Sequence, residues 1–561
     1  MRKPIVLLAV LSILHTPIAA WSQSAVGPHG AVATVNQIAS EAGVEAMKRG
    51  GNAVDAAVAA ALTLGVVNGF NSGIGGGCFI LVRRANGELL AIDGRETAPA
   101  AAARDMFLSQ GHADAALSQF GALASGTPGA LAAEDMALKT CGRLPLKELL
   151  LSAAKIAAEG FTVDTHYAAV LKDAAPELRK FKSSRSAFLK PDGAAYGAGE
   201  VLKQPDLART YRAIASKGIG WFYGGPFARA TEKWMKQNHG IMTAADLRNY
   251  RAVFRQPVST DYRGYTIVSF PPPSSGGVHV LEILNMLETR DFRSPGFTAV
   301  DRDHFIAEAM KLAFADRAFW LGDPAFAKVP RGLISPAYGR ELAARIDMGH
   351  VTDVAGHGTP DNASGDVFPE HTTHVSAADA EGNWVALTAT VNTHFGCKAV
   401  IPGTGVIMNN EMDDFTAAPG ATNYFGLTGA EANTVAPGKR PLSSMSPTLV
   451  LKNNHPVLSV GAAGGPTIIS QTVLNIVNVL DLGMDAQSAI ASPKFHHQWK
   501  PDELTVERAM PAAILDGLKQ RGHILRLVNS LGAAQAVSVM PDGSGFMGAA
   551  DPRAGGKAAA W

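Results

Sequence analysis

The sequence carries almost no excess charge of either sign. Lys and Arg number 50 and Asp and Glu number 49, so the formal net charge is +1. Domains that hold nucleic acid or an anionic membrane by electrostatics show a marked excess of Lys and Arg, usually gathered on one face. The composition therefore argues against both kinds of partner.

Cysteines and long apolar runs are also scarce. The 561 residues include only Cys78, Cys141 and Cys397, and three cysteines at these spacings fit neither a disulfide scaffold nor a zinc site. Beyond the first residues, no predominantly apolar run has the about 20 residues that a transmembrane helix needs. Because 47% of the residues are hydrophobic, the chain instead predicts a large folded core.

The chain opens with a pattern typical of an export signal. Arg2 and Lys3 precede ten mostly apolar residues, 5–14, and small residues follow. A run of about ten is too short to span a bilayer but matches the apolar part of a signal peptide. We expect residues 1–24 to be removed, with cleavage after residue 20, 22 or 24 left open, and the mature protein to be periplasmic or secreted. A retained membrane anchor is the alternative.

Local signals predict several elements of the main chain. Residues 52–67 have the pattern of a helix with Asn52 as its N-cap. Farther along, Gly464-Gly465-Pro466 separates a predicted strand from a strongly apolar helix, and the proline suits a first helical turn. Two glycines at a helix N-terminus leave backbone N–H groups available to stabilise an anion. A plain strand-to-helix turn is the alternative.

A predicted linker and a predicted hairpin follow one another in the second half of the chain. Residues 351–370 are rich in Gly, Asp and Pro, which indicates an exposed, mobile segment. The hairpin strands cover 372–378 and 384–392, and a turn centred on residue 381 pairs positions whose numbers sum to 762. Thr372 then lies opposite Thr390.

The alternation of side chains gives this hairpin two different faces. A period of two puts Thr372, His374 and Ser376 on one face, which they share with three polar residues of the partner strand: Thr388, Thr390 and Asn392. The other face is apolar and predicts a contact with the core. The polar row is either part of a functional site or simply the solvent-facing side of the hairpin.

Taken together, these segments closely resemble the γ-glutamyltranspeptidase (glutathione hydrolase) family of N-terminal-nucleophile hydrolases. The matching motifs run from about residue 30 to residue 553 and include GIGGG, PPPSSGG, TTHVS, TATVNT, NNEMDDF, PLSSMSPT and GAAGG. TTHVS, PLSSMSPT and GAAGG in this order are highly specific. The resemblance implies an α+β fold, a four-layer αββα sandwich formed by both halves of the chain together.

The resemblance gives the linker a purpose, because members of the family are made as inactive precursors. The match puts the scissile bond between His371 and Thr372. The products would be a large subunit of residues 25–371, including the linker 351–371, and a small catalytic subunit of residues 372–561. Thr372 would be the nucleophile. Its newly freed α-amine, which titrates at about 7.7–8.0, would be the base.

The resemblance also implies roles for the other residues of the site. Thr390 matches the hydroxyl that hydrogen-bonds the nucleophile, and Gly464 and Gly465 match the oxyanion hole. A γ-glutamyl group ends in a zwitterion. The matches to residues that bind its α-carboxylate are Arg95, Ser443 and Ser444, and the matches to those that bind its α-ammonium are Asn392, Glu411 and Asp414. We expect one set for each charge.

One segment departs from the family pattern. Residues 419–433 match a lid that covers the glutamyl pocket in bacterial members that have one. The expected aromatic residue is a tyrosine followed by glycine, but here Tyr424 comes one residue early and Phe425 precedes Gly426. The sequence leaves open which of the two rings closes the pocket.

The implied activity is cleavage of the γ-glutamyl amide of glutathione and related compounds through a γ-glutamyl-Thr372 ester. The acyl group then passes to water, an amino acid or a peptide, without a cofactor or a metal. The implied partners are these small molecules and the two subunits, with no nucleic acid and no membrane span. Two alternatives stay open: a β-lactam acylase of the glutaryl-cephalosporin type on the same scaffold, and an exported solute-binding protein without catalysis.

Overall fold

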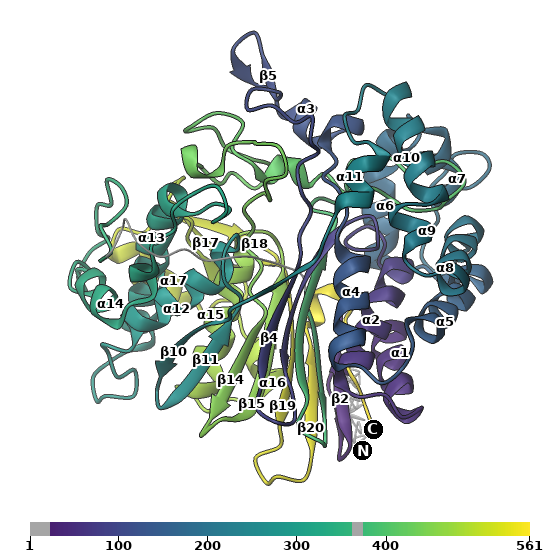
Figure 1. The fold of residues 1–561 in the computed structure, drawn as a ribbon. Coiled ribbons are helices and arrows are strands. Elements are labelled where there is room, and N and C mark those ends of the chain that lie inside the picture. The colour runs from purple at the N-terminus through teal and green to yellow at the C-terminus, as the bar shows by residue number, and fades with distance from the viewer. Residues whose placement is uncertain (1–22, 362–373) are drawn as a thin grey trace, which may run out of the picture.

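The computed structural model describes residues 23–361 and 374–561, and two stacked seven-stranded sheets lie at its centre (Figure 1). The first sheet has the strand order β1 (Ala25–Gly27), β20 (Phe546–Ala550), β19 (Ala533–Val539), β15 (His455–Ala463), β14 (Thr448–Lys452), β11 (Tyr265–Ser269) and β10 (Val258–Tyr262). The second has the order β21 (Ala559–Ala560), β2 (Gly30–Ala33), β12 (Val375–Asp379), β13 (Trp384–Thr390), β3 (Gly77–Arg83), β4 (Leu89–Gly94) and β9 (Val253–Arg255).

Helices cover the outer face of each sheet, which makes four layers (Figure 1). Against the second sheet lie α1 (Gln37–Lys48), α2 (Ala53–Val67) and α4 (Ala130–Cys141), while α5 (Leu146–Glu159) packs on α2 and α8 (Pro205–Lys217) packs on α5. Against the first lie α12 (Ser275–Leu287), α15 (Thr467–Leu480) and α16 (Ala486–Ala491), while α13 (Ala299–Trp320) and α14 (Pro336–Ala343) pack on α12, and α17 (Ala512–Gln520) packs on α13.

The remaining strands and α-helices lie around this sandwich. They are β5 (Leu108–Ser109), β6 (His112–Ala113), β7 (Phe161–Thr162), β8 (Val201–Leu202), β16 (Phe495–His496), β17 (Leu504–Glu507), β18 (Leu525–Val528), α3 (Ala115–Gln119), α6 (Thr165–Leu178), α7 (Lys182–Phe188), α9 (Gly220–Tyr223), α10 (Pro226–Gln237) and α11 (Ala244–Asn249). Within the described ranges, no helix is long and apolar enough to cross a membrane.

Three apolar cores hold the layers together. Phe79, Phe270 and Trp384 belong to the core between the sheets, while separate clusters fill the space between each sheet and its helices. Each sheet takes strands from both sides of residues 362–373. Neither part of the chain therefore forms a complete sheet alone, and the predicted αββα sandwich built from both parts is confirmed.

Local signals fixed the elements that frame the site. Asn52 caps α2 as predicted: its side chain accepts from the backbone N–H of Val54, and Asp55 accepts from the N–H of Asn52 at 2.8 Å. Each such cap satisfies donors that the first helical turn leaves free. Likewise, β15 and α15 lie on either side of Gly464-Gly465-Pro466, as the sequence predicts.

The register of the β12–β13 hairpin agrees with the prediction. Val375 pairs with Leu387 and Ser376 with Ala386, so paired positions sum to 762. The polar face, however, does not face solvent. His374, Ser376 and Thr388 are buried, and Ser376 Oγ lies 2.9 Å from the hydroxyl of Ser459 on β15. The polar row therefore lies between the two sheets.

The chain is anchored where it approaches the predicted cleavage site. The N–H of Val351 donates to Arg521 O at 2.9 Å, Lys311 Nζ to Thr352 O at 2.7 Å, and Trp499 Nε1 to Val354 O at 2.8 Å. Residues 351–361 thus follow a path held by both parts of the chain, and residues 353, 355, 357, 359 and 361 along it are exposed, as expected of the linker. The rest of the linker, His371, Thr372 and the export signal up to residue 22 lie outside the described residues.

Candidate active site

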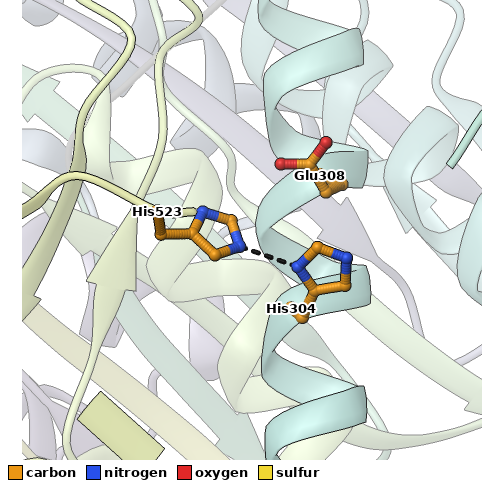
Figure 2. A group of neighbouring side chains, drawn as sticks. All are labelled: His304, Glu308 and His523. Carbon is orange, nitrogen blue, oxygen red and sulfur yellow. Dashed lines mark hydrogen bonds between the residues drawn. The ribbon is translucent and has the colours of Figure 1, made fainter. Parts of the chain in front are cut away.

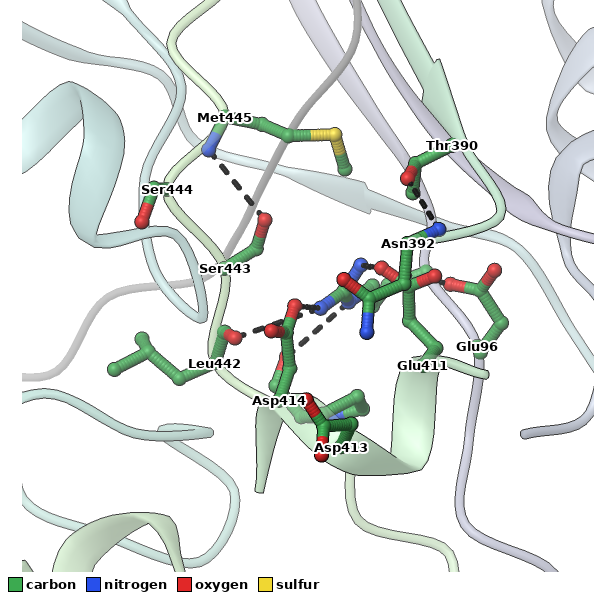
Figure 3. Close-up of polar contacts among 12 residues, drawn as sticks. Glu96, Thr390, Asn392, Glu411, Asp413, Asp414, Leu442, Ser443, Ser444 and Met445 are labelled. Carbon is green, nitrogen blue, oxygen red and sulfur yellow. Dashed lines mark hydrogen bonds and ion pairs between the residues drawn. The ribbon is translucent and has the colours of Figure 1, made fainter. Parts of the chain in front are cut away.

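A cavity of about 390 Å³ opens where β13 and β15 end. Nine of the residues predicted to act in catalysis or binding are described by the structure. Eight of them line this cavity: Thr390, Asn392, Glu411, Asp414, Ser443, Ser444, Gly464 and Gly465. Arg95 is fully buried beside it. The predicted site residues, which come from five separated segments of the chain, therefore meet in the structure. Figure 3 shows several of them around a common space.

Thr390 is the last residue of β13, and the backbone turns sharply after it. Its Oγ1 accepts a hydrogen bond from the N–H of Asn392 at 2.7 Å, which leaves the hydroxyl proton available to a group in the cavity. Asn392 has φ of 75° and donates from Nδ2 to Asn410 O at 3.0 Å. The turn therefore presents both polar side chains at the same end of the strand (Figure 3).

The GIGGG motif lies directly behind Thr390. A Cβ on Gly76 would stand 1.8 Å from the carbonyl oxygen of Thr390, and one on Gly75 would stand 1.9 Å from that of Ile407. No other residue fits at such distances, so the motif serves close backbone packing. These glycines let the backbone of the motif pack directly against the carbonyl groups of Thr390 and Ile407.

Arg95 is held by the acids that we expected to bind the ammonium. Its Nη1 donates to Glu411 Oε1 and its Nη2 to Asp414 Oδ2 at 2.6 Å, while Glu96 lies 3.7 Å away. Nε donates to Pro441 O at 3.2 Å. The two sets of residues, one for each charge, are therefore not separate. Protein groups already occupy most of the guanidinium's donors.

This cluster contains more carboxyl groups than guanidinium groups. Glu96, Glu411 and Asp414 face Arg95, and Arg317 adds a second guanidinium whose charge acts on Asp414. Burial raises the pKa of Glu96 to about 8 and that of Glu411 well above its ordinary value, although Arg95 opposes both shifts. At neutral pH the cluster therefore retains a proton, and an incoming cation would favour its release.

The segment that carries Ser443 and Ser444 is fixed by the PPPSSGG motif. The N–H of Ser443 donates to Pro273 O at 3.0 Å, and Ser275 donates to Ser443 O from both its N–H and its hydroxyl, at 2.9 and 2.6 Å. The two hydroxyls of Ser443 and Ser444 point to opposite sides of their segment (Figure 3). The expected carboxylate-binding serines therefore have fixed main-chain positions.

Arg317 is a component of the site that the sequence reasoning missed. It lies on α13, is 5% exposed, and donates from Nε to Ser275 Oγ at 2.8 Å and from Nη2 to Ser444 Oγ at 3.2 Å. Among the described residues, no carboxylate forms an ion pair with it. A charged Asp316-Arg317 step in the otherwise apolar last part of this helix, residues 312–320, was the available signal, since a buried guanidinium is expensive unless it has a purpose.

A second missed residue, Arg440, fixes the backbone of Arg95. Its Nη1 donates to Asp93 Oδ1 at 2.7 Å and to Arg95 O at 2.8 Å. Arg440 and Asp93 are both buried. Because the pair joins the PLSS segment to the end of β4, it holds Arg95 and the two serines in one frame.

Gly464 and Gly465 adopt backbone angles that suit glycine, with φ of 129° and 59°. Among the described residues, neither N–H donates a hydrogen bond to a protein acceptor. A Cβ on Gly465 would lie 2.5 Å from the ring of Phe425. Phe425 therefore packs over this glycine, whereas Tyr424 is 57% exposed. The geometry thus favours Phe425 as the ring that covers the cavity.

Comparison with known proteins agrees with this arrangement. The chain is 43% identical over 530 residues to a glutathione hydrolase proenzyme of Escherichia coli (strain K12), covering 93% of this chain and 90% of that protein. It is 39% identical to the acylase ACY 1 proenzyme of Pseudomonas sp. (strain SE83), over 94% and 93% of the two chains.

Structural and family comparisons point the same way. The crystal structure of cephalosporin acylase from Bacillus halodurans matches with a TM-score of 0.86 and 28% identity over 99% of each chain. The model of the family described as gamma-glutamyltranspeptidase matches residues 39–561. The chain therefore belongs to the γ-glutamyltranspeptidase family of N-terminal-nucleophile hydrolases.

Proposed function

We propose that this protein is an autoprocessed γ-glutamyltransferase and glutathione hydrolase. It cleaves the γ-glutamyl amide of glutathione and related compounds and passes the acyl group to water, an amino acid or a peptide. The observation that carries the proposal is the meeting of eight motif residues, from four separated segments, around one cavity. Family membership over residues 39–561 supports the same activity.

The nucleophile in this proposal is Thr372, which lies outside the described residues. The pairing of Val375 with Leu387 supports its assignment, because the same register extended along the hairpin pairs position 372 with Thr390. Self-cleavage after His371 would free the α-amine of Thr372, which then takes the proton from its own hydroxyl. Thr390 Oγ1 already accepts from Asn392 N–H, so its own proton can be donated to the nucleophile's oxygen.

Two further groups complete the chemistry. The N–H groups of Gly464 and Gly465 would stabilise the oxyanion of the tetrahedral intermediate, since they have no protein acceptor among the described residues. A lost oxyanion donor typically costs a factor of about 10²–10³ in rate. Collapse of the intermediate would release the amine and leave a γ-glutamyl ester on Thr372, which water or an acceptor amine then attacks.

Recognition of the zwitterion follows from the charge of the cluster. The α-ammonium would be bound by Asn392, Glu411 and Asp414, where the carboxylates outnumber Arg95. The α-carboxylate would be bound by Arg95, Ser443 and Ser444. Because Arg95 already bonds Glu411 and Asp414, Arg317 beside Ser444 becomes an important source of positive potential for that carboxylate.

The chain organisation is part of the proposal. We assign residues 25–371 to the large subunit and residues 372–561 to the small one, after removal of an export signal within residues 1–24. The mature protein would be periplasmic or secreted. Small-molecule γ-glutamyl donors and acceptors would be its partners, and no cofactor or nucleic acid has a part in the reaction.

A β-lactam acylase of the glutaryl type is the second candidate, favoured by the TM-score of 0.86 to the Bacillus halodurans acylase. A glutaryl chain has the distal carboxylate but no α-ammonium. An acylase substrate would therefore offer no cation to the two carboxylates, Glu411 and Asp414, on the cavity wall. This retained pair favours the glutamyl substrate over the glutaryl one.

The test measures both substrates on the purified, tag-free protein. We expect glutathione-dependent release of glutamate and a kcat/KM for a γ-glutamyl anilide well above that for a glutaryl anilide. A preference for the glutaryl anilide would replace the proposal with the acylase. Binding of glutathione without any turnover by a chain that stays intact would favour a solute-binding protein.

A further inference from the structure

Two histidines and a glutamate meet outside the active-site cavity. His304 and Glu308 lie one turn apart on α13, and His523 lies between α17 and β18 (Figure 2). One ligand atom from each lies within 4.8 Å of those of the other two. Exposure is 0% for His304, 1% for Glu308 and 6% for His523, and none of the three lines the cavity described above.

The hydrogen bonds of His304 determine which of its nitrogens faces the cluster with a lone pair. Nε2 lies 2.7 Å from the carbonyl oxygen of Asp347, and Nδ1 lies 2.8 Å from His523 Nε2. A carbonyl can only accept, so Nε2 carries the proton and Nδ1 presents its lone pair. Metal-ligating histidines commonly donate their other ring N–H to a backbone carbonyl in this way.

Glu308 directs an unused oxygen into the same buried space. Its Oε2 accepts from the N–H of Thr352 at 2.7 Å, whereas Oε1 is buried and has no hydrogen-bond partner among the described residues. A buried carboxylate oxygen without a partner is costly. In Figure 2 the carboxylate lies above both imidazole rings.

The neighbouring charges do not neutralise Glu308. Lys311 lies 2.8 Å from Asp502, which also bonds His497 at 3.1 Å, and Arg521 pairs with Asp301. Each nearby cation thus has a carboxylate of its own.

We propose that His304 Nδ1, Glu308 and His523 Nε2 form a binding site for a divalent transition-metal ion, with Zn²⁺ as the best fit. Two imidazoles and one carboxylate are a ligand set typical of zinc, and a water would complete a tetrahedron. Metal–ligand distances of about 2.0–2.2 Å require the two rings to move apart slightly and Oε1 to turn inward. The ring proton of His523, which the hydrogen bond to His304 Nδ1 places on Nε2, would move to Nδ1 of the same ring so that Nε2 can bind the ion.

The position of the site suggests a structural role. His304 and Glu308 precede residues 362–373 and His523 follows them, so a bound ion would join the two parts of the chain. It would also tie down Asp347 and Thr352, whose backbones already bond His304 and Glu308. The ion would link two separate subunits only after the proposed cleavage. The binding of the metal does not depend on that cleavage.

The experiment titrates Zn²⁺ alone into the full, tag-free protein after treatment with a chelator and desalting. Calorimetry should give one equivalent of binding, Co²⁺ should give the visible absorption of a four-coordinate site, and Zn²⁺ should raise Tm. Glu308→Gln, which keeps the side-chain volume, and His523→Ala should each weaken binding at least ten-fold. His497→Ala, a neighbouring histidine outside the cluster, should bind as the unmodified protein does.

Two results would overturn the proposal. The first is the absence of stoichiometric binding by the unmodified protein. The second is binding that survives in Glu308→Gln, which decides the matter even where His523→Ala fails to fold. Either would leave a hydrogen-bonded histidine pair that only packs the two parts of the chain together. The γ-glutamyl anilide assay on the same samples reports separately on the proposed activity.

Discussion

Replacing Asp414 with asparagine separates recognition of the ammonium from recognition of the carboxylate. Asp414 lines the cavity and accepts from Arg95 Nη2 at 2.6 Å and from Asn423 Nδ2 at 3.2 Å. Asp414→Asn keeps the shape and removes one charge. Arg95 keeps Glu411 and Glu96 as partners, so the change should leave the fold intact.

The size of the effect follows from what remains in the site. A hydrogen bond to a charged group contributes about 1.5–3 kcal/mol, and each 1.4 kcal/mol is a factor of about ten. Because Glu411 still faces the ammonium, we expect the loss of one such bond and not of the whole charge. The kcat/KM for a γ-glutamyl anilide should therefore fall about 10- to 150-fold.

The assay compares two substrates on each protein. A glutaryl anilide lacks the ammonium, so Asp414→Asn should change its kcat/KM less than about three-fold. Asp413→Asn is the matched control: it alters the adjacent carboxylate, which lies outside the cavity lining and bonds Ser118 and the N–H of Tyr424. It should affect both substrates alike. Equal losses for the two substrates in Asp414→Asn would refute the reasoning.

Three other variants test the nucleophile, the buried guanidinium and the electrostatics of the core. Thr372→Ala should stay a single inactive chain on a denaturing gel, while Thr372→Ser should cleave and react more slowly; cleavage of the alanine variant would rule out self-processing. Arg317→Met should lower kcat/KM for glutamyl and glutaryl anilides equally, about 10- to 150-fold, with partial recovery in Arg317→Lys, and a loss confined to the glutamyl substrate would contradict its assignment. Burial raises the pKa of Glu134 to about 8, so the protonated form stabilises the fold fully below pH 4.5 and this contribution is lost as pH rises through 8. Urea unfolding should show a decline of up to about 4 kcal/mol between pH 5 and pH 8 that Glu134→Gln reduces, and an unchanged decline would place its origin elsewhere.

The parts of this fold that the sequence predicts well are those fixed by nearby residues. The cap at Asn52 needs only the next three residues, and the β12–β13 register needs only the turn between its strands. Family motifs extended this to the cavity, because residues matched one by one were found together there. Their roles remain predictions.

What the sequence did not predict depends on contacts between distant segments. The ion pair of Arg95 with Glu411 spans 316 residues, and no spacing along the chain indicates it. The burial of Ser376 follows from the packing of the first sheet over the hairpin, which the hairpin pattern alone cannot anticipate. Arg317 lies 127 residues from Ser444, and only the packing of α13 beside the PLSS segment brings them together.

The most direct test of the central claim is the N-terminal residue of the smaller fragment in the mature, active protein. Mass spectrometry and N-terminal sequencing should give Thr372 as the first residue of a fragment that continues to Trp561, in a preparation that releases glutamate from glutathione. A fragment beginning at any other residue, or an active chain with the His371–Thr372 bond intact, would contradict the account.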